Sequence, residues 1–195
     1  MITHHPGRVA VSLCAAFIAL IAHSPPASGD NWAGASGIYG LCSDGINRTD
    51  SATMSFHYQD LSAHMTSRVN WVRTERIHPT DLHTSIHAAA TSSTDVIVLD
   101  QYYDDYCGLN WDRGVWGLYN CRSIRSDRSC EQAHVRFNNT FTTGFTANQR
   151  NSLVCHEVGH AIGLIHREAT GCIRVGNLSH SGYSTHDRAH INNAF

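Results

Sequence analysis

Hydrophobic and polar residues recur in the first half of the chain with the periods of two strands and one helix. Apolar and polar side chains alternate over Thr53–Tyr58 and again over Leu82–Ile86, which is the pattern of a half-buried strand. Between them, apolar residues recur at three- and four-residue spacing over Leu61–Val72, directly after the candidate helix cap Asp60. This helix is expected to end before Pro79, which cannot continue it.

Three more strands are predicted downstream. The segment Asp95–Asp100 is apolar throughout its centre without alternation, as expected for a strand in the interior of a sheet. The segments Val115–Asn120 and Ala133–Asn138 have the composition of two further strands. The turn-rich, cysteine-bearing segments between them are expected to depend on disulfides for their order.

Two capping-box patterns mark helices in the second half of the chain. Thr146 and Gln149 predict a long amphipathic helix that ends at Gly163, a residue suited to a left-handed stop. Ser184 and Asp187 predict a short helix at the C-terminus in the same way. The order of strand, helix, several strands, long helix and short helix predicts an α+β fold with a mixed twisted sheet.

The N-terminus has the pattern of a secretory signal peptide. Arg8 supplies the positive charge and Val9–Ala22 the apolar run. Ala27 and Gly29 are small residues at the −3 and −1 positions of a cut before Asp30. The run is too short for a comfortable membrane span. We therefore expect a secreted protein in which residues 1–29 are removed.

Composition supports one globular domain over residues 30–195. The chain has 195 residues, 42% of them hydrophobic and 15% charged, and its net charge is −2. This balance argues against a nucleic acid or an anionic membrane as partner. The sequence shows no internal repeat or long linker, and we expect a monomer.

If the protein is secreted, its cysteines are expected to form disulfides. Without Cys14, which lies in the signal segment, an even number remains, and an oxidising compartment then favours three disulfides among 15 connectivities. No C-x-x-C pair supports cysteine as a metal ligand. The six cysteines are Cys42, Cys107, Cys121, Cys130, Cys155 and Cys172.

Histidines on the long predicted helix have the spacing of a metal site. His156 and His160 are four residues apart, so their rings lie on one face and can reach one ion at roughly 2.0–2.1 Å. Gly163 lets the chain turn, so that His166 can return as a third ligand. Glu157 points about 100° away and can reach a water molecule on the ion. Three protein ligands leave one position open, which is typical of catalytic zinc.

The full string H-E-x-x-H-x-x-G-x-x-H resembles the metzincin clan of zinc endopeptidases, and within it the matrixin-like secreted enzymes. The resemblance covers about Asn70 to Phe195, loosely outside the zinc helix. It implies a zincin-like fold and one catalytic Zn²⁺ ion held by His156, His160 and His166. It also implies that Glu157 is the general base that activates water for hydrolysis of peptide bonds.

The same resemblance implies polypeptide substrates that bind extended along an edge strand. By its order in the chain, the segment from Val115 to Tyr119 is the candidate for this strand, and an ordinary outer strand is the alternative. Its residues are Val115, Trp116, Gly117, Leu118 and Tyr119.

Position 173 departs from the family pattern. The resemblance places a methionine beneath the zinc there, and this chain has Ile173, which keeps the apolar character but loses the adaptable unbranched shape. We expect a looser but functional site. Because Cys155 and Cys172 flank the helix and this turn, a disulfide between them would tie the two together over a short loop.

Two alternative functions remain open from the sequence. One is a zinc-binding pseudoenzyme that binds a partner protein in the cleft without cutting it, and Ile173 is its support. The intact Glu157 speaks against it. The other is a secreted disulfide scaffold whose helix binds no metal.

Weaker candidates lie outside the motif. Acidic residues in one loop offer oxygen ligands for Ca²⁺, although acidic surface loops without an ion are common. His186 and His190 share the i, i+4 spacing but lack a third partner, so we interpret them as an exposed helix face. Tyr183 is a candidate donor to the oxyanion. The acidic residues are Asp100, Asp104, Asp105 and Asp112.

Overall fold

The computed structural model describes residues 31–34, 36–43, 45–168, 170–176 and 178–195. The predicted signal peptide lies outside the described residues. The strands are β1 (Thr53–Tyr58), β2 (His83–Ile86), β3 (Val96–Gln101), β4 (Gly117–Ile124) and β5 (Cys130–Asn138). The α-helices are α1 (Ala63–Val72), α2 (Asn139–Thr142), α3 (Ala147–Ile162) and α4 (Thr185–Ala194).

One mixed sheet contains all five strands. Their order is β2-β1-β3-β5-β4, with β4 antiparallel to β5 and the other neighbouring pairs parallel. The run Val96–Leu99 is buried in the central strand, which confirms the interior strand that its unbroken apolar pattern predicted. β4 forms one edge of the sheet.

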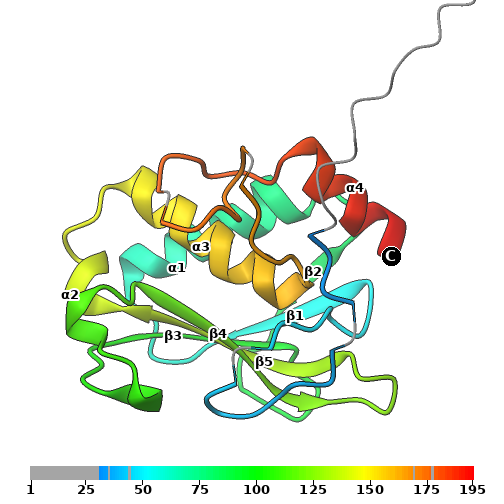
Figure 1. Cartoon of the computed structure of the whole chain (residues 1–195), viewed down its shortest axis with the longest axis horizontal. Coiled ribbons are helices and arrows are strands. Elements are labelled where there is room, and N and C mark those ends of the chain that lie inside the picture. Colours follow the sequence, from blue (N-terminus) through cyan, green and yellow to red (C-terminus); the bar gives the residue numbers. More distant parts are fainter. Residues whose placement is uncertain (1–30, 35, 44, 169, 177) are drawn as a thin grey trace, which may run out of the picture.

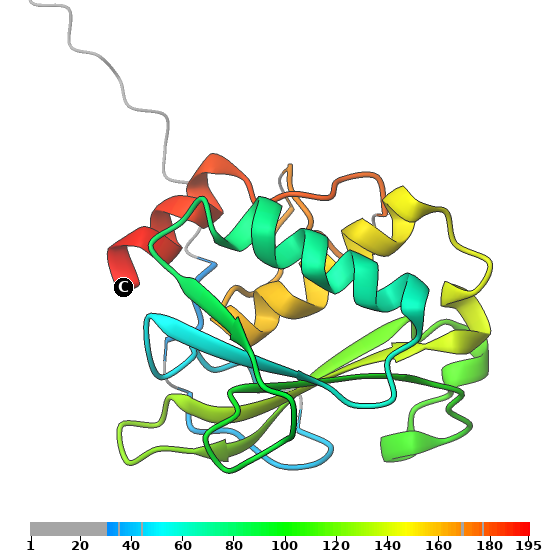
Figure 2. The ribbon, with the colours of Figure 1, turned by 180° about the vertical axis from the view of Figure 1, so that it is seen from behind.

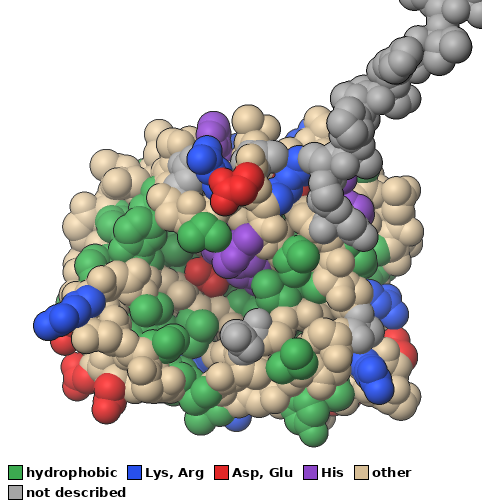
Figure 3. Space-filling view, in the orientation of Figure 1, with side chains coloured by type: hydrophobic (Ala, Val, Ile, Leu, Met, Phe, Trp, Pro, Cys, Tyr) green, Lys and Arg blue, Asp and Glu red, His purple; other side chains and the backbone are tan. Residues whose placement is uncertain are grey.

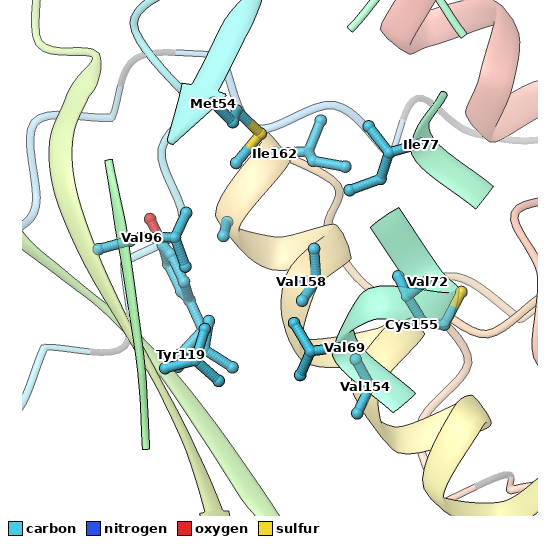
Figure 4. Close-up of a cluster of buried hydrophobic side chains, with 14 of the residues drawn as sticks. Met54, Val69, Val72, Ile77, Val96, Tyr119, Val154, Cys155, Val158 and Ile162 are labelled. Atoms are coloured by element: carbon cyan, nitrogen blue, oxygen red, sulfur yellow. The ribbon is translucent and has the colours of Figure 1, made fainter. Parts of the chain in front are cut away.

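Helices α1 and α3 cover the same face of this sheet. Figures 1 and 2 show both helices above the strands from opposite sides, with α3 nearer to β4. Their apolar faces meet the sheet in one hydrophobic core. Figure 4 shows part of it, with Val69 of α1 beside Val154 of α3 and Tyr119 of β4 facing them from the sheet. The core therefore fixes α3 against the edge of the sheet.

The predicted bounds of several elements need correction. Ser62, and not Asp60, is the N-cap of α1, because Asp60 has a positive φ of 51° outside the helix. The helical path continues beyond α1 as a π-helical turn from Arg73 to Ile77. β4 begins at Gly117, two residues after the predicted Val115.

In the part of the chain that the structure describes, three disulfides form, in the pairs Cys42–Cys107, Cys121–Cys130 and Cys155–Cys172. Among the described residues, no helix is long and apolar enough to span a membrane. Between α3 and α4 the chain is irregular and folds back over α3 (Figure 1).

Candidate metal centre

Helix α3 presents the two histidines of the H-E-x-x-H string. Its capping box forms as predicted, since the Thr146 hydroxyl accepts from the Gln149 N–H at 3.3 Å and the Gln149 side chain accepts from the Thr146 N–H at 2.8 Å. The apolar face packs into the core, so the helix is fixed in position. His156 and His160 then lie one above the other, with ring centroids 4.6 Å apart.

The third histidine is brought back by a sharp turn at Gly163. This residue has a φ of 125°, and a Cβ there would lie 2.7 Å from the Cα of Arg48. The N-terminal segment holds the returning chain, because the Ala33 N–H donates to the Gly163 carbonyl and the Ile165 N–H donates to Asn31. The turn places His166 beside the other two rings.

The three Nε2 atoms form a nearly equilateral triangle. The separations are 3.1 Å for His156 and His160, 3.0 Å for His160 and His166, and 3.0 Å for His156 and His166. Among the described His, Cys, Asp and Glu residues, these three histidines form the cluster whose ligand atoms lie close enough together to hold one metal ion.

The protonation of two of these rings is fixed by backbone carbonyls. The Nδ1 of His156 lies 2.7 Å from the Cys172 carbonyl, and that of His160 lies 2.6 Å from the Leu164 carbonyl. A carbonyl only accepts, so each Nδ1 carries the hydrogen and each neutral ring turns the lone pair of Nε2 toward the other. Such a pair repels unless a cation or a donating water molecule lies between the two nitrogens.

The donor set fits zinc. Tetrahedral ligands at 2.0–2.1 Å from zinc are separated by roughly 3.3 Å, close to the observed triangle. Burial lowers the pKa of His156 to about 4 and also lowers the pKa values of His160 and His166. All three rings are therefore neutral at pH 7, which is the form that binds metal.

Glu157 lies beside this triangle against the edge strand. The Tyr119 backbone N–H faces its carboxyl group and partly offsets the effect of burial on its pKa, and a Cβ at Gly117 would lie only 2.7 Å from Oε1. The side chain is 6% exposed, and this burial raises the pKa of its carboxyl group to about 8. The close approach of Gly117 leaves room for the carboxyl group beside the edge strand, although nothing in the sequence pattern pointed to this role.

Ile173 forms an apolar floor under α3. It is 1% exposed, and a Cβ on Gly159 would lie 2.3 Å from its Cδ1 and 3.1 Å from Tyr183. The expectation for Tyr183 was wrong. Its hydroxyl is buried and donates to the Cys155 carbonyl at 3.2 Å, because the ring packs beneath the helix and away from the cleft.

The disulfide between Cys155 and Cys172 connects this floor to the helix. Cys172 also supplies the carbonyl that accepts from His156. One residue therefore links the covalent bridge and the orientation of a candidate ligand ring.

A cavity of about 530 Å³ opens over the three histidines and Glu157. Figure 3 shows histidine and acidic side chains in a hollow of this face with hydrophobic side chains on either side. The segment Gly114–Tyr119 forms one wall, so the structure brings the candidate edge strand to the site. Other lining residues, unforeseen from the sequence, are Ile46, Leu153, Arg174, Val175, Gly176 and Leu178.

The weaker candidates lie apart from this cavity. Asp100 is 4% exposed and accepts hydrogen bonds from the N–H and hydroxyl of Ser62, the residue that precedes α1. The calcium hypothesis stays a prediction. The Nε2 atoms of His186 and His190 lie 3.0 Å apart on α4, and the His190 ring stacks on Trp32.

Comparison with solved structures gives matches of low similarity. A crystal structure of myroilysin matches 74% of this chain and 58% of its own, with 14% identity and a TM-score of 0.43. A second structure of myroilysin matches 63% of this chain and 48% of its own, with 12% identity and a TM-score of 0.39. The chain thus spans about half the length of these two matches.

A crystal structure of archaemetzincin from Archaeoglobus fulgidus, complexed with malonate, matches 70% of this chain and 98% of its own. The identity is 10% and the TM-score is 0.42. No protein-family model and no curated protein matches the chain.

Proposed function

We propose that this protein is a secreted, matrixin-like zinc endopeptidase. The observation that carries the proposal is the convergence of the Nε2 atoms of His156, His160 and His166, with the carboxyl group of Glu157 beside them on a cavity wall. With each Nδ1 donating to a carbonyl, two of these nitrogens turn lone pairs toward each other, an arrangement that suits a shared cation.

The residues around the site suit hydrolysis of a peptide bond. A bound zinc ion supplies a water of pKa about 7 and polarises the carbonyl to be attacked. Glu157 takes one proton from the attacking water and delivers it to the departing amine. A nearby cation also lowers the pKa of a carboxyl group, which returns Glu157 to the basic form that this step needs.

The cavity and the edge of β4 support a polypeptide substrate. An extended chain can add to the sheet along Gly117–Tyr119 and place a side chain in the largely apolar cavity. The three disulfides support an extracellular location, since such bonds persist in oxidising compartments.

The test is cleavage of a diverse peptide mixture by the oxidised protein without residues 1–29. We expect cutting that a zinc chelator abolishes and added zinc restores. Glu157→Gln should reduce kcat/KM by about 10²–10⁴-fold, the usual contribution of a general base. Because Glu157 is not a ligand, zinc content should stay at one ion per chain.

Each alternative gives a different result. A folded, zinc-loaded protein that cuts no peptide would favour the pseudoenzyme that binds a protein partner. A folded protein that retains no zinc would favour the disulfide scaffold. Loss of zinc together with activity in Glu157→Gln would contradict the role assigned to this residue.

A further inference from the structure

The backbone N–H and C=O groups of β4 fall into two sets. One set bonds to β5, and the other points outward from the edge of the sheet. The Asn138 N–H donates to the Trp116 carbonyl at 2.9 Å, and this pair continues the β4–β5 register. Residues of an antiparallel pair alternate between bonding the partner strand and pointing away from it. Gly117, Tyr119 and Cys121 therefore direct their N–H and C=O groups to the outer edge, where the Tyr119 N–H faces the Glu157 carboxyl group.

Residues 36–43, which we call the strap, lie against the outer edge of β4 and bond to it at Cys121. The Gly40 N–H donates to the Cys121 carbonyl at 2.7 Å. The side chain of Asn120 donates to the Ser43 carbonyl at 2.6 Å. The strap thus occupies the place where a further strand would lie, and Figure 1 shows this blue segment passing the sheet beside β4.

The strap is anchored at both ends. The fully buried Asn47 accepts hydrogen bonds from the Ser36 hydroxyl and the Gly37 N–H, both at 2.8 Å. The disulfide Cys42–Cys107 holds the other end. A peptide that competed for the edge at Cys121 would therefore have to displace a cross-linked segment.

The cavity ends where the strap begins. Its wall runs from Gly114 to Tyr119, and no strap residue is among the described residues that line it. Glu157 lies against Gly117, so the bond to be cut lies near the start of β4. From there to Cys121 the edge measures roughly 13 Å, at 3.3 Å per residue.

We propose that the site acts on polypeptides near their amino terminus, with no more than about three residues on the amino side of the cleaved bond. The inference rests on the proposed peptidase function. Antiparallel pairing with β4, the more stable arrangement per residue, directs the amino side of the substrate toward Cys121 and the strap. The carboxyl side runs the other way, toward Gly114.

A length series tests the inference. Peptides carry one to six residues on the amino side of one bond and an identical carboxyl side, and the zinc-loaded protein cleaves them under the same conditions. We expect kcat/KM to be highest at three residues or fewer, and to fall at least about tenfold by six, since each lost edge hydrogen bond costs about 1 kcal/mol. A constant or rising kcat/KM up to six residues would overturn the inference and leave the peptidase intact. No cleavage at any length would overturn both.

Two variants that free the strap provide the second arm. Cys42→Ser/Cys107→Ser removes its cross-link, and Gly40→Pro removes its N–H and forbids the φ of 134° found there. In either variant we expect kcat/KM for the peptide with six residues on the amino side to rise relative to kcat/KM for the peptide with three. Gly144→Ala is the control, because a Cβ there would meet only the Phe141 carbonyl, at 3.6 Å, and the residue lies outside the strap and the edge of β4. An unchanged length limit in folded strap variants would show that the strap is not the barrier.

Discussion

The carboxyl group of Glu157 lies against the backbone of Gly117, so close that a Cβ at position 117 would be 2.7 Å from Oε1 and 2.8 Å from Cγ. We expect Gly117→Ala to displace the carboxyl group and lower kcat by about tenfold or more, because small misplacements of catalytic groups are costly. Zinc content should not change. Steady-state kinetics and metal analysis measure the two effects.

Two comparisons make this prediction specific to the contact. Gly144→Ala is a matched control, because a Cβ there would meet only the Phe141 carbonyl, at an ordinary 3.6 Å. Glu157→Asp shortens the side chain, so adding Gly117→Ala to it should cost less than in the wild type. Equal losses in both backgrounds would refute the steric link.

Replacing the third candidate ligand should weaken zinc binding while the fold is preserved. We expect His166→Ala to weaken zinc binding by more than the 10–100-fold typical of losing an outer-shell partner. The fold should persist, because His166 is exposed on the turn after α3. His180→Ala is the control, since His180 is also exposed and lies outside the triangle. Competition with a chromophoric chelator measures the affinity, and an unchanged value would place the third ligand elsewhere.

The disulfide beneath the helix should matter for both stability and metal. Removing it in Cys155→Ala/Cys172→Ala should lower the free energy of unfolding by about 2–4 kcal/mol. It should also weaken zinc binding, because the Cys172 carbonyl orients His156. Cys121→Ala/Cys130→Ala should destabilise the β4–β5 hairpin and leave zinc affinity unchanged. Denaturation and zinc titration of both variants test the difference.

At position 173, a change in side-chain shape should affect stability little, whereas a loss of side-chain volume should affect it strongly. Ile173→Met keeps the volume, so the free energy of unfolding should change by less than about 1.5 kcal/mol. Ile173→Ala leaves a cavity under Gly159 and should cost about 2–5 kcal/mol. Thermal unfolding of the zinc-loaded variants measures both. A large loss in Ile173→Met would show that the floor requires a branched side chain.

In the metal-free protein, the ionisation of Glu157 should cost stability as the pH rises, in opposition to the three histidines, whose lowered pKa values favour the folded state at higher pH. Burial raises the pKa of Glu157 from 4.5 to about 8, so the folded state holds this proton more tightly than the unfolded state. Its contribution is complete below pH 4.5 and is lost as the pH rises toward 8. Glu157→Gln does not ionise, so its stability relative to the wild type should grow over this range, by up to roughly 4 kcal/mol. Urea unfolding at pH 5 and pH 8 without zinc tests this, and equal pH dependence would contradict it.

Much of the fold followed from local pattern. The capping boxes at Thr146 and Ser184 place the starts of α3 and α4 correctly, because each depends on residues three positions apart. The start of α1 was misplaced. Its cap, Ser62, is selected by its hydrogen bonds to Asp100, a residue of β3 that is distant in sequence.

The sequence by itself determined the chemistry of the candidate site. Three histidines and Glu157 lie within one helix and the turn after it, where helix geometry and Gly163 suffice to bring them together. Only the tertiary structure decided what surrounds them. Gly117 touches Glu157 and the strap meets Cys121 across long stretches of chain, and such contacts depend on how the sheet and α3 pack, which no local pattern encodes.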